Sequence, residues 1–434
     1  MRSSLSGFVL AAGKAKRMGV LCDPKANRFP IAKPALTVGR NSLIRQQLYL
    51  LQLMGITTAA IAVKHSAETV RRAIVRDNNL SIKTEIFDLN DLEVEDWGAA
   101  WTVSRWLAMT PDCPENLVVL NGDVVWDERL ARPFIERFLA GSDWGQILAA
   151  HTPLEHIFGR FGAIQLKGEQ ALTIYHDYLN QCRAAAGDQE KLVHARMDYQ
   201  AAWLRRVEQI AGQVVRVRHF QEKPAQSDYH SHVSSLANVG LFALKTGVFD
   251  RFAHSLGADF ADFARHLFQA GMIKEHLPLS AFIATAGSYW RDIGTPKDLL
   301  RANFGLLNSR INLGYQGEEV RPGVWLGRGV EIPSAVLEQI TPPVIISDDV
   351  MIGNKVRLGP RVVVGRGWRI GGQARVSNSL LLPAYYPEDR NRVIAARQAI
   401  DHAIIAGGTI DRSVENMIAV ISPAGEVVYY DYRF

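Results

Sequence analysis

Apolar residues recur at every sixth position through the last third of the chain. The seven members of this series are Ile346, Ile352, Leu358, Val364, Ile370, Val376 and Leu382. A period of six fits neither an amphipathic helix nor a single strand, but it fits a coil of three six-residue sides with every sixth side chain inside. Four of the seven are followed by glycine, as expected at corners that lie close to the neighbouring coil. The pattern predicts a left-handed parallel β-helix.

Short apolar runs alternate with helical patterns through residues 1–308. Phe8–Ala12, Ala59–Val63 and Leu117–Leu120 have the length of buried strands. A helical pattern from Leu43 to Met54, closed by Gly55, lies between the first two runs. This alternation predicts an α/β, Rossmann-like domain with a mainly parallel sheet. The chain is therefore expected to divide into this domain, residues 1–308, and the β-helix domain, residues 309–434.

The overall composition narrows the classes of partner. The 434 residues carry a formal net charge of +5, and their Lys and Arg residues are dispersed along the chain. Without a long basic run, nucleic-acid or membrane binding is not favoured, and an anionic small molecule fits the charge as well. No stretch reaches the roughly 18 apolar residues that span a bilayer. Three widely spaced cysteines, Cys22, Cys113 and Cys182, favour a reducing, cytoplasmic location over a disulfide framework.

Site residues are expected in the loops after Ala12, Val63 and Leu120, because ligands of parallel sheets bind beyond the carboxyl ends of the strands. The first loop combines small residues with cations: Leu10, Ala11, Ala12, Gly13, Lys14 and, further on, Arg17. Backbone N–H groups in such a turn can cradle a phosphate chain, and Arg17 can neutralise it. The loop matches neither the dinucleotide fingerprint nor the P-loop pattern. A glycine after a buried strand in a basic loop is also common without any phosphate, so that alternative stays open.

Carboxylates and lysines supply the remaining candidates. Asp123 follows the third strand, where an aspartate can hold Mg²⁺ together with substrate phosphates, and Asp292 could supply a second carboxylate. Helix capping is the alternative for both. Lys223 follows Glu222 at the end of an expected strand, where it could bind a second phosphate. For Lys33, and for the Glu222–Lys223 pair, a solvated surface position is the alternative.

Six short motifs follow one another through the first domain. They are LAAGxxxR from Leu10, KPAL from Lys33, NGD from Asn121, EKP from Glu222, NxG from Asn238 to Gly240, and WRDIGTP from Trp290. This order resembles the sugar-1-phosphate nucleotidyltransferases, also called NDP-sugar pyrophosphorylases, over roughly residues 6–308, and the hexapeptide tail extends the resemblance. The chain is most similar to the branch that joins glucose-1-phosphate adenylyltransferases with GDP-mannose pyrophosphorylase-like members.

The resemblance implies roles for individual residues. Arg17, Lys33 and Asp123 would be catalytic. The nucleotide would be held by the loop from Leu10 to Lys14 together with Arg17, Gly98 and Asp123. The sugar phosphate would be held by Gly162, Glu222, Lys223, Asn238 and Gly240. Asp123 and Asp292 would carry Mg²⁺, the implied cofactor.

The implied reaction condenses an NTP with a hexose 1-phosphate, or with a sugar-like cyclitol 1-phosphate, to give an NDP-sugar and pyrophosphate. A phosphate oxygen of the sugar phosphate attacks the α-phosphorus in line, while the protein positions and screens the two anions. Glucose-1-phosphate adenylyl transfer is the best match. Guanylyl transfer to mannose 1-phosphate, or to a related sugar or cyclitol phosphate, is the alternative.

Several segments depart from the family pattern. Ala15 stands where the phosphate loop usually has a second glycine, which narrows the accessible backbone angles. The stretch from Arg17 to Lys33 is longer than usual, so Lys25 is a rival for the phosphate role. A polar segment near residues 174–213 predicts an inserted helical pair close to the sugar side, which suggests an unusual sugar or a cyclitol.

The tail supports two further hypotheses. Hexapeptide β-helices also build acyltransferases, which commonly use a histidine base, and His402 is the single histidine after the hexads begin. A non-catalytic regulatory subunit would keep the fold, although the presence of Asp123, Lys223 and Asp292 argues against it. The flat faces and open ends of a solenoid favour assembly, so a dimer or tetramer of identical chains through the β-helix is expected.

Overall fold

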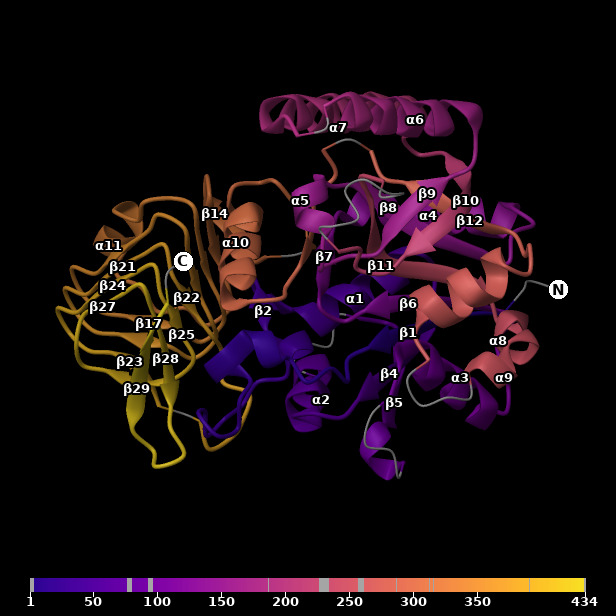
Figure 1. The fold of residues 1–434 in the computed structure, drawn as a ribbon. Coiled ribbons are helices and arrows are strands. Elements are labelled where there is room, and N and C mark those ends of the chain that lie inside the picture. Colours follow the sequence, from indigo (N-terminus) through magenta and orange to yellow (C-terminus); the bar gives the residue numbers. More distant parts are fainter. Residues whose placement is uncertain are drawn as a thin grey trace.

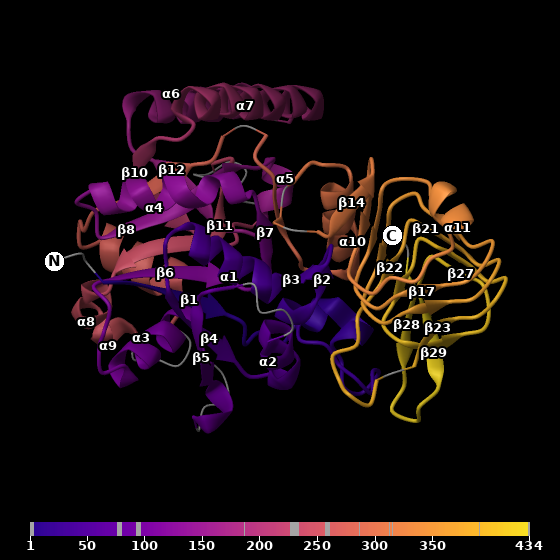
Figure 2. The ribbon, with the colours of Figure 1, turned by 180° about the vertical axis from the view of Figure 1, so that it is seen from behind.

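The computed structural model places a layered α/β head beside a parallel β-helix (Figure 1). It describes residues 4–75, 80–92, 97–185, 187–225, 234–256, 261–285, 287–311, 313–314, 316–389 and 391–432. The β-helix lies next to α10 (Pro296–Leu307), at the end of the molecule away from α8 (Gly247–Arg251), as Figures 1 and 2 both show. Within the described ranges, no helix is both long and apolar enough to cross a membrane.

A nine-stranded sheet forms the centre of the head. In spatial order its strands are β5 (Lys83–Asp88), β4 (Thr58–Val63), β1 (Leu5–Leu10), β6 (Asn116–Asn121), β11 (Leu236–Lys245), β8 (Gly145–His151), β12 (Leu279–Ile283), β10 (Val214–Gln221) and β9 (Ala163–Leu166). The strands β5, β4, β1 and β6 are all parallel, as predicted. The other half of the sheet is mixed, because β10 and β11 run against their neighbours. β1 also ends earlier than predicted, so Ala11 and Ala12 belong to the loop that follows it.

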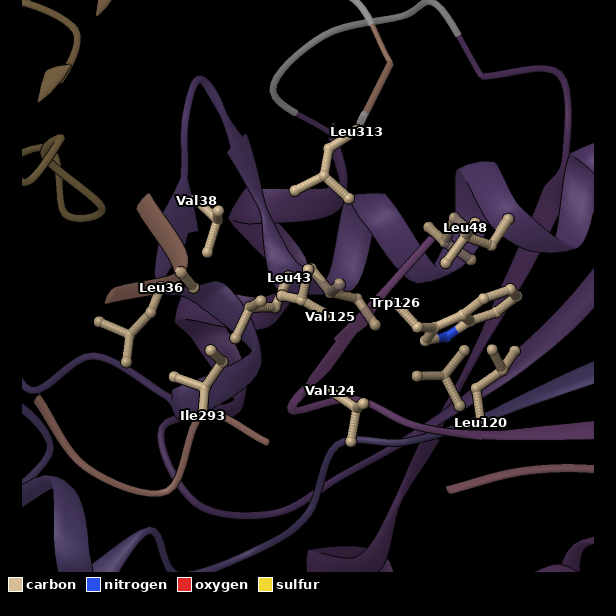
Figure 3. Packing of buried hydrophobic residues seen from close by; sticks show 14 of the residues in the cluster. Leu36, Val38, Leu43, Leu48, Leu120, Val124, Val125, Trp126, Ile293 and Leu313 are labelled. Carbon is tan, nitrogen blue, oxygen red and sulfur yellow. The ribbon is translucent and has the colours of Figure 1, made fainter. Parts of the chain in front are cut away.

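Alternate side chains of the sheet feed two hydrophobic layers, since successive residues of a strand face opposite sides. Val9 and Leu120 belong to the first layer, and Phe8 and Val119 belong to the second. The first layer is covered by α1 (Leu43–Leu53), α2 (Ala67–Val75), α4 (Ala131–Ala140) and α10; the second is covered by α3 (Ala99–Met109), α5 (Leu154–Ile157), α8, α9 (Ala253–Leu256) and a π-helix over Phe263–Ile273. Figure 3 shows the first layer around Trp126, which is buried and lies beside Leu48 and Leu120.

Helix α1 confirms the helical pattern expected from Leu43. The hydroxyl of Ser42 accepts a hydrogen bond from the N–H of Arg45 and so caps the first turn. Gly55 follows the helix with a φ of +79°, a left-handed conformation that favours glycine and ends the helix. Two small ribbons complete the head: β2 (Thr37–Val38) with β3 (Asn41–Ser42), and β7 (Val124–Trp126) with β13 (Trp290–Asp292).

An inserted pair of helices lies across one side of the head (Figures 1 and 2). α6 (Glu169–Ala184) and α7 (Gln189–Ile210) confirm the helical pair predicted near residues 174–213. The rings of Tyr178 and Tyr199 stack between the two helices with centroids 4.2 Å apart. Trp203 and Val207 of α7 are buried in the second hydrophobic layer, which fixes the pair to the sheet.

Three parallel sheets build the tail into a β-helix. Its first coil has 20 residues, because residue 326 pairs with 346, and the next has 18, because residue 346 pairs with 364, 352 with 370 and 358 with 376. The first sheet contains β14 (Glu318–Arg321), β15 (Val324–Leu326), β16 (Val344–Ile346), β19 (Val362–Val364), β22 (Leu380–Leu381), β25 (Ile404–Ile405), β28 (Met417–Ile421) and β29 (Val427–Asp431). The second contains β17 (Met351–Ile352), β20 (Arg369–Ile370), β23 (Arg392–Ile394) and β26 (Gly408–Ile410), and the third contains β18 (Arg357–Leu358), β21 (Arg375–Ser377), β24 (Ala399–Asp401) and β27 (Val414–Glu415). A short helix, α11 (Ser334–Glu338), lies between β15 and β16. β14 and β29 pair antiparallel at the two edges of the first sheet.

The hexad pattern is correct for six of its seven members. These six side chains lie in the hydrophobic interior of the coil, whereas Leu382 packs outward against the head and Leu381 takes the interior position. The reason is a turn between β21 and β22 that is one residue shorter than the hexad requires. The corner glycines behave as expected: a Cβ at Gly353, Gly365 or Gly371 would lie 2.6–2.7 Å from backbone atoms of the next coil.

The head and the β-helix share one hydrophobic cluster. The hydroxyl of Tyr385 donates to the carbonyl of Ala35, and the hydroxyl of Tyr386 donates to the carbonyl of Pro30 at 3.0 Å. These two contacts lie on either side of Lys33 in the sequence. The tail therefore braces the head segment that carries one of the predicted catalytic residues.

Candidate functional site

A cavity of about 480 Å³ lies at the carboxyl ends of β1 and β6. Its lining residues are Leu10, Ala11, Ala12, Gly13, Lys33, Pro34, Trp97, Ala99, Thr102, Asn121, Asp123 and Lys223. The two strand-end loops meet because the N–H of Gly122 donates to the carbonyl of Leu10 at 2.9 Å. A Cβ at Gly122 would lie only 2.8 Å from that oxygen. The NGD glycine thus permits the close approach that brings the predicted phosphate loop beside Asp123.

Lys33 is the centre of the charged groups in this cavity. Its Nζ lies 2.5 Å from a carboxylate oxygen of Asp123 and 3.8 Å from one of Asp292, and its side chain is only 11 % exposed. Arg17 approaches Asp292 to 3.7 Å. Asp292 reaches this place because β13 pairs with β7, so that Asp292 lies opposite Val124, the residue after Asp123. The three predicted catalytic residues, Arg17, Lys33 and Asp123, therefore come together with Asp292, the second predicted metal ligand.

The electrostatic environment of the cluster shifts two of its groups. Burial alone would lower the pKa of Lys33, but the carboxylates of Asp123 and Asp292 outweigh burial and raise it above its usual value. Burial, and then repulsion from Asp123, raise the pKa of Asp292 despite the nearby charges of Lys33 and Arg17. Two carboxylates that repel each other across one ammonium group form a site that favours additional positive charge.

The phosphate loop is strained at Ala15. This residue has φ +50° and ψ +30°, the left-handed conformation that glycine adopts without steric cost and other residues adopt at a cost. Alanine therefore replaces the usual glycine at the loop position whose left-handed backbone favours glycine. The remaining positions from Leu10 to Gly13 have no left-handed residue.

Gly162 and Glu222 define the side of the site expected to hold the sugar. A Cβ at Gly162 would lie 2.6 Å from the ring of Phe220 and 3.0 Å from a carboxylate oxygen of Glu222. Burial raises the pKa of Glu222, against the lowering effect of Lys223. Only glycine fits between the aromatic ring and this carboxylate. Neither Gly162 nor Glu222 is among the residues that line the cavity.

Asn238 and Gly240 lie in β11, where its pairing with β8 is irregular. The N–H of Asn238 donates to the carbonyl of Gly162 at 2.8 Å, and the N–H of Gly240 donates to the side chain of Asn238 at 2.9 Å. Gly240 has a φ of +84°, and a Cβ there would lie 2.5 Å from the amide of Asn121. Both residues thus shape the wall near Gly162 through backbone contacts.

Lys223 enters the cavity from the end of β10 in a strained conformation. Its φ is +44°, and its Nζ lies 3.5 Å from Glu222. A non-glycine residue in this region costs free energy, and in this protein such residues also occur in the β-helix, for example Lys355 and Arg397. The side chain is more than half exposed, so its charge is available to a ligand in the cavity.

Gly98 precedes α3 as its N-cap residue, between Trp97 and Ala99 of the cavity wall. It does not itself line the cavity, but its carbonyl accepts the hydroxyl of Thr102, which does. The predicted nucleotide-side role of Gly98 therefore corresponds to a position at the edge of the cavity. Residues 93–96, which directly precede Trp97, lie outside the described residues.

Three rival or peripheral residues lie elsewhere. Lys25 is exposed in the loop between Arg17 and Lys33 and does not line the cavity, so the geometry favours Lys33. Lys14 is exposed. Burial lowers the pKa of His65, and the positive charge of Lys14 lowers it further. His402 binds Asp401 at 2.8 Å at a corner of the β-helix, far in sequence and fold from the cluster around Lys33.

The residues present fit a divalent cation. Mg²⁺ takes oxygen ligands and is commonly bound through one or two carboxylates together with substrate phosphates. Asp123 and Asp292 offer two such carboxylates around the ammonium group of Lys33, and burial together with repulsion from Asp123 raises the pKa of Asp292. Within the described part of the chain there is no group of three or more His, Cys, Asp or Glu that could hold a metal ion without a ligand's help.

Several lining residues were not predicted from the sequence. Trp97 lies under the Nζ of Lys64 at 4.0 Å from its ring centroid, and His65 lies 5.9 Å from the same ring. Asn121 also lines the cavity. A signal existed for Lys64 and His65, since they directly follow Val63 at the carboxyl end of β4. Asn121 was part of the NGD motif but was given no role.

Comparison with known proteins gives one family match and several structural neighbours. Residues 206–309 match the family model described as nucleotidyl transferase. A putative glucose-1-phosphate thymidylyltransferase from Bacillus anthracis, solved in complex with a sucrose, has 18% sequence identity and a TM-score of 0.47, covering 72% of this chain and 98% of its own. A UDP-glucose pyrophosphorylase complexed with UDP-glucose has 13% identity and a TM-score of 0.48, covering 70% and 98%. The matched segment contains Glu222, Lys223, Asn238, Gly240 and Asp292. On the family match, the chain is an enzyme of the nucleotidyltransferase type.

Proposed function

We propose that this chain condenses an NTP with a hexose 1-phosphate, or a sugar-like cyclitol 1-phosphate, to give an NDP-sugar and pyrophosphate. The observation that carries the proposal is the position of Lys33, with its Nζ 2.5 Å from Asp123 and 3.8 Å from Asp292, in the cavity at the ends of β1 and β6. Such a cluster can hold two phosphate groups in contact with cations. The presence of the whole cluster also favours a catalytic chain over a non-catalytic regulatory subunit.

The N–H of Ala11 donates to the carbonyl of Ala62, so within the loop the backbone N–H groups of Ala12 and Gly13 are the ones offered to the triphosphate, and Arg17, beside Asp292, is assigned to the leaving pyrophosphate. Lys33 faces the α-phosphate under attack. Because the attacking phosphate oxygen is already anionic, the protein needs no general base and forms no covalent intermediate. Its task is to align two anions that repel each other and to screen their charge.

Asp123 and Asp292 are the residues that would hold Mg²⁺. When bound there, the cation would neutralise charge on the phosphate oxygens and help to orient them. Without a phosphate present, Lys33 pairs with these carboxylates. A triphosphate in the cavity gives the ammonium group of Lys33 a second anionic partner.

On the sugar side, we assign Lys223 to the sugar phosphate and Glu222 to the sugar hydroxyls. Glu222 packs closely against Gly162, whose carbonyl accepts the N–H of Asn238, and the side chain of Asn238 accepts the N–H of Gly240. Lys223 lines the same cavity as Lys33 and Asp123. One cavity therefore holds a cation for each of the two phosphates.

For the substrates, we propose adenylyl transfer to glucose 1-phosphate as the first candidate. The support is the similarity of the KPAL and WRDIGTP segments to glucose-1-phosphate adenylyltransferases. Guanylyl transfer to mannose 1-phosphate or a related phosphate is the alternative. The three free cysteines agree with a reducing, cytoplasmic compartment.

We also propose that the β-helix is left-handed, as its hexad pattern predicts, and that it assembles identical chains into a dimer or tetramer. Its parallel coils leave open edges that favour stacking between subunits. Size-exclusion chromatography with light scattering tests this. A monomeric mass at every concentration would refute the assembly.

The activity is tested by pyrophosphate release with Mg²⁺ over ATP, GTP, UTP, CTP and dTTP against glucose, mannose and N-acetylglucosamine 1-phosphates. One NTP and one sugar phosphate should give turnover well above the others. The same grid with Asp123→Asn is the control, and that variant should lose turnover while keeping its circular dichroism spectrum. Equal turnover in the variant would contradict the assignment of Asp123.

A further inference from the structure

A second cavity, of about 500 Å³, lies next to the candidate site and is lined by four arginines. They come from different parts of the fold: Arg160 follows α5, Arg291 lies on β13, Arg301 lies on α10 and Arg310 follows α10. We call this space the arginine cavity. Its acidic lining residues are Asp292 and Asp298.

The arginine cavity carries more positive than negative charge. Asp298 is nearly buried, and it lies 3.5 Å from Arg291 and 3.8 Å from Arg160. The hydroxyl of Thr295 also donates to Asp298 at 2.8 Å. Arg301 and Arg310 form no ion pair with any residue that the structure describes. Four guanidinium groups thus face one space with only two carboxylates, one of which belongs to the cluster around Lys33.

Position ties the arginine cavity to the sugar side of the candidate site. Phe161 and Trp290 line it, and their rings meet edge to face with centroids 4.9 Å apart. Phe161 directly precedes Gly162, and Trp290 lies two residues before Asp292. Asp292 lines the arginine cavity and also lies 3.8 Å from Lys33. A group bound among the arginines would therefore lie just beyond the place assigned to the sugar.

The inserted helices reach the same region. The side chain of Gln200 on α7 donates to Glu155 on α5 at 3.1 Å, and the neighbouring His156 lines the arginine cavity. The rim of the cavity is thus partly supported by the insertion between β9 and β10. This contact gives the insertion a physical link to ligand binding.

We propose that the arginine cavity binds an oxyanion, a phosphate or carboxylate group, beside the sugar end of the site. A planar guanidinium group can bind either a phosphate or a carboxylate through two parallel hydrogen bonds. Arginine is therefore better suited than lysine to binding such an oxyanion. This inference rests on the proposed function for the location of the sugar, but not for the chemistry of the cavity. The oxyanion has two possible sources: a second anionic group on the substrate itself, or a separate small phosphorylated ligand.

The test uses the full-length protein and the double variant Arg301→Gln with Arg310→Gln. Both arginines are exposed at the cavity and lie outside the catalytic cluster. Lys297→Gln is the matched control, because Lys297 lies on the same helix outside the cavity and its replacement also removes a cation. Turnover is measured with glucose 1-phosphate, glucose 1,6-bisphosphate and glucuronic acid 1-phosphate. Binding of glucose 1,6-bisphosphate and of inorganic phosphate is measured by calorimetry.

If the oxyanion belongs to the substrate, wild type will prefer a doubly anionic substrate to glucose 1-phosphate. The double variant will then lose about tenfold or more in kcat/KM for the doubly anionic substrate and not for glucose 1-phosphate. If it belongs to a separate ligand, inorganic phosphate will bind wild type and the control, and its affinity will fall about tenfold in the double variant. Equal binding and equal selectivity in all three proteins would overturn the proposal. The binding arm needs no turnover, so an inactive substrate grid would count against the proposed function without affecting this test.

Discussion

Replacement of Lys33 by methionine tests the centre of the proposed site. Methionine keeps the length of an unbranched side chain and removes the charge. In the structure the ammonium group of Lys33 lies between two carboxylates and is nearly buried. The variant would leave Asp123 and Asp292 without the cation they share. It would also leave the α-phosphate of the NTP without its nearest fixed positive charge.

The expected loss follows from the distances. Two unit charges about 4 Å apart, the scale of a contact between the ammonium group of Lys33 and a phosphate oxygen, interact by about 4 kcal/mol at an effective dielectric constant of 20. Water that fills the vacated space will recover part of this. A net loss of about 3 kcal/mol in transition-state stabilisation corresponds to a fall of about a hundredfold in kcat/KM.

The assay is initial-rate pyrophosphate release with the best substrate pair, and Lys25→Met is the matched control. Lys25 is an exposed lysine of the same loop, and it was the rival for the same role in the sequence. The control should stay within about twofold of wild type. Comparable losses in both variants, or a Lys33→Met enzyme within threefold of wild type, would refute the reasoning.

Three further outcomes are expected. Ala15→Gly should raise the free energy of unfolding by about 1 kcal/mol in urea titrations, because glycine adopts the left-handed conformation without strain; a destabilised variant would contradict the strain at this position. Without added metal, ionisation of Asp292 should lower the thermal stability of wild type as pH rises from the acidic range, and Asp292→Asn should remove this contribution. The raised pKa of Asp292 means that the folded protein binds more protons there than the unfolded chain, so ionisation costs stability as pH rises; an unchanged pH profile would argue against the shift. Tyr385→Phe should lower the free energy of unfolding by about 1–2 kcal/mol, since the buried carbonyl of Ala35 loses its donor; an unchanged urea midpoint would show that the hydrogen bond contributes nothing.

Much of the fold was predictable because it depends on local periodicity. The helix α1 and the coiled tail carry a repeat that secondary structure imposes on the sequence, and β1, β4 and β6 are short apolar runs of strand length. The prediction was wrong at Leu382 because one turn of the coil is a residue shorter than the hexad requires. Leu381 therefore takes the interior position, and a fixed period of six cannot predict a change confined to one turn.

The mixed half of the sheet was not predictable from such patterns. β11 is an apolar strand like its neighbours, whereas β10 mixes apolar and basic residues, and nothing in the residues of either strand determines the direction in which it pairs. Direction depends on the connections, and the segments before and after these strands have no strict repeat. The sequence therefore supported a mainly parallel sheet, while long-range pairing produced two reversed strands.

For the site, the sequence by itself supplied the types of residue and their places at strand ends. Lys33, Asp123, Lys223 and Asp292 each followed from a short motif, because small turns and charged residues after buried strands are visible in one dimension. Only the tertiary structure decided which of them share a space. The pairing of β13 with β7 carries Asp292 to Asp123, and the exposed position of Lys25 removes it as a rival to Lys33. The arginine cavity is likewise tertiary, since Arg160, Arg291, Arg301 and Arg310 belong to no common motif and meet only where separate elements pack together.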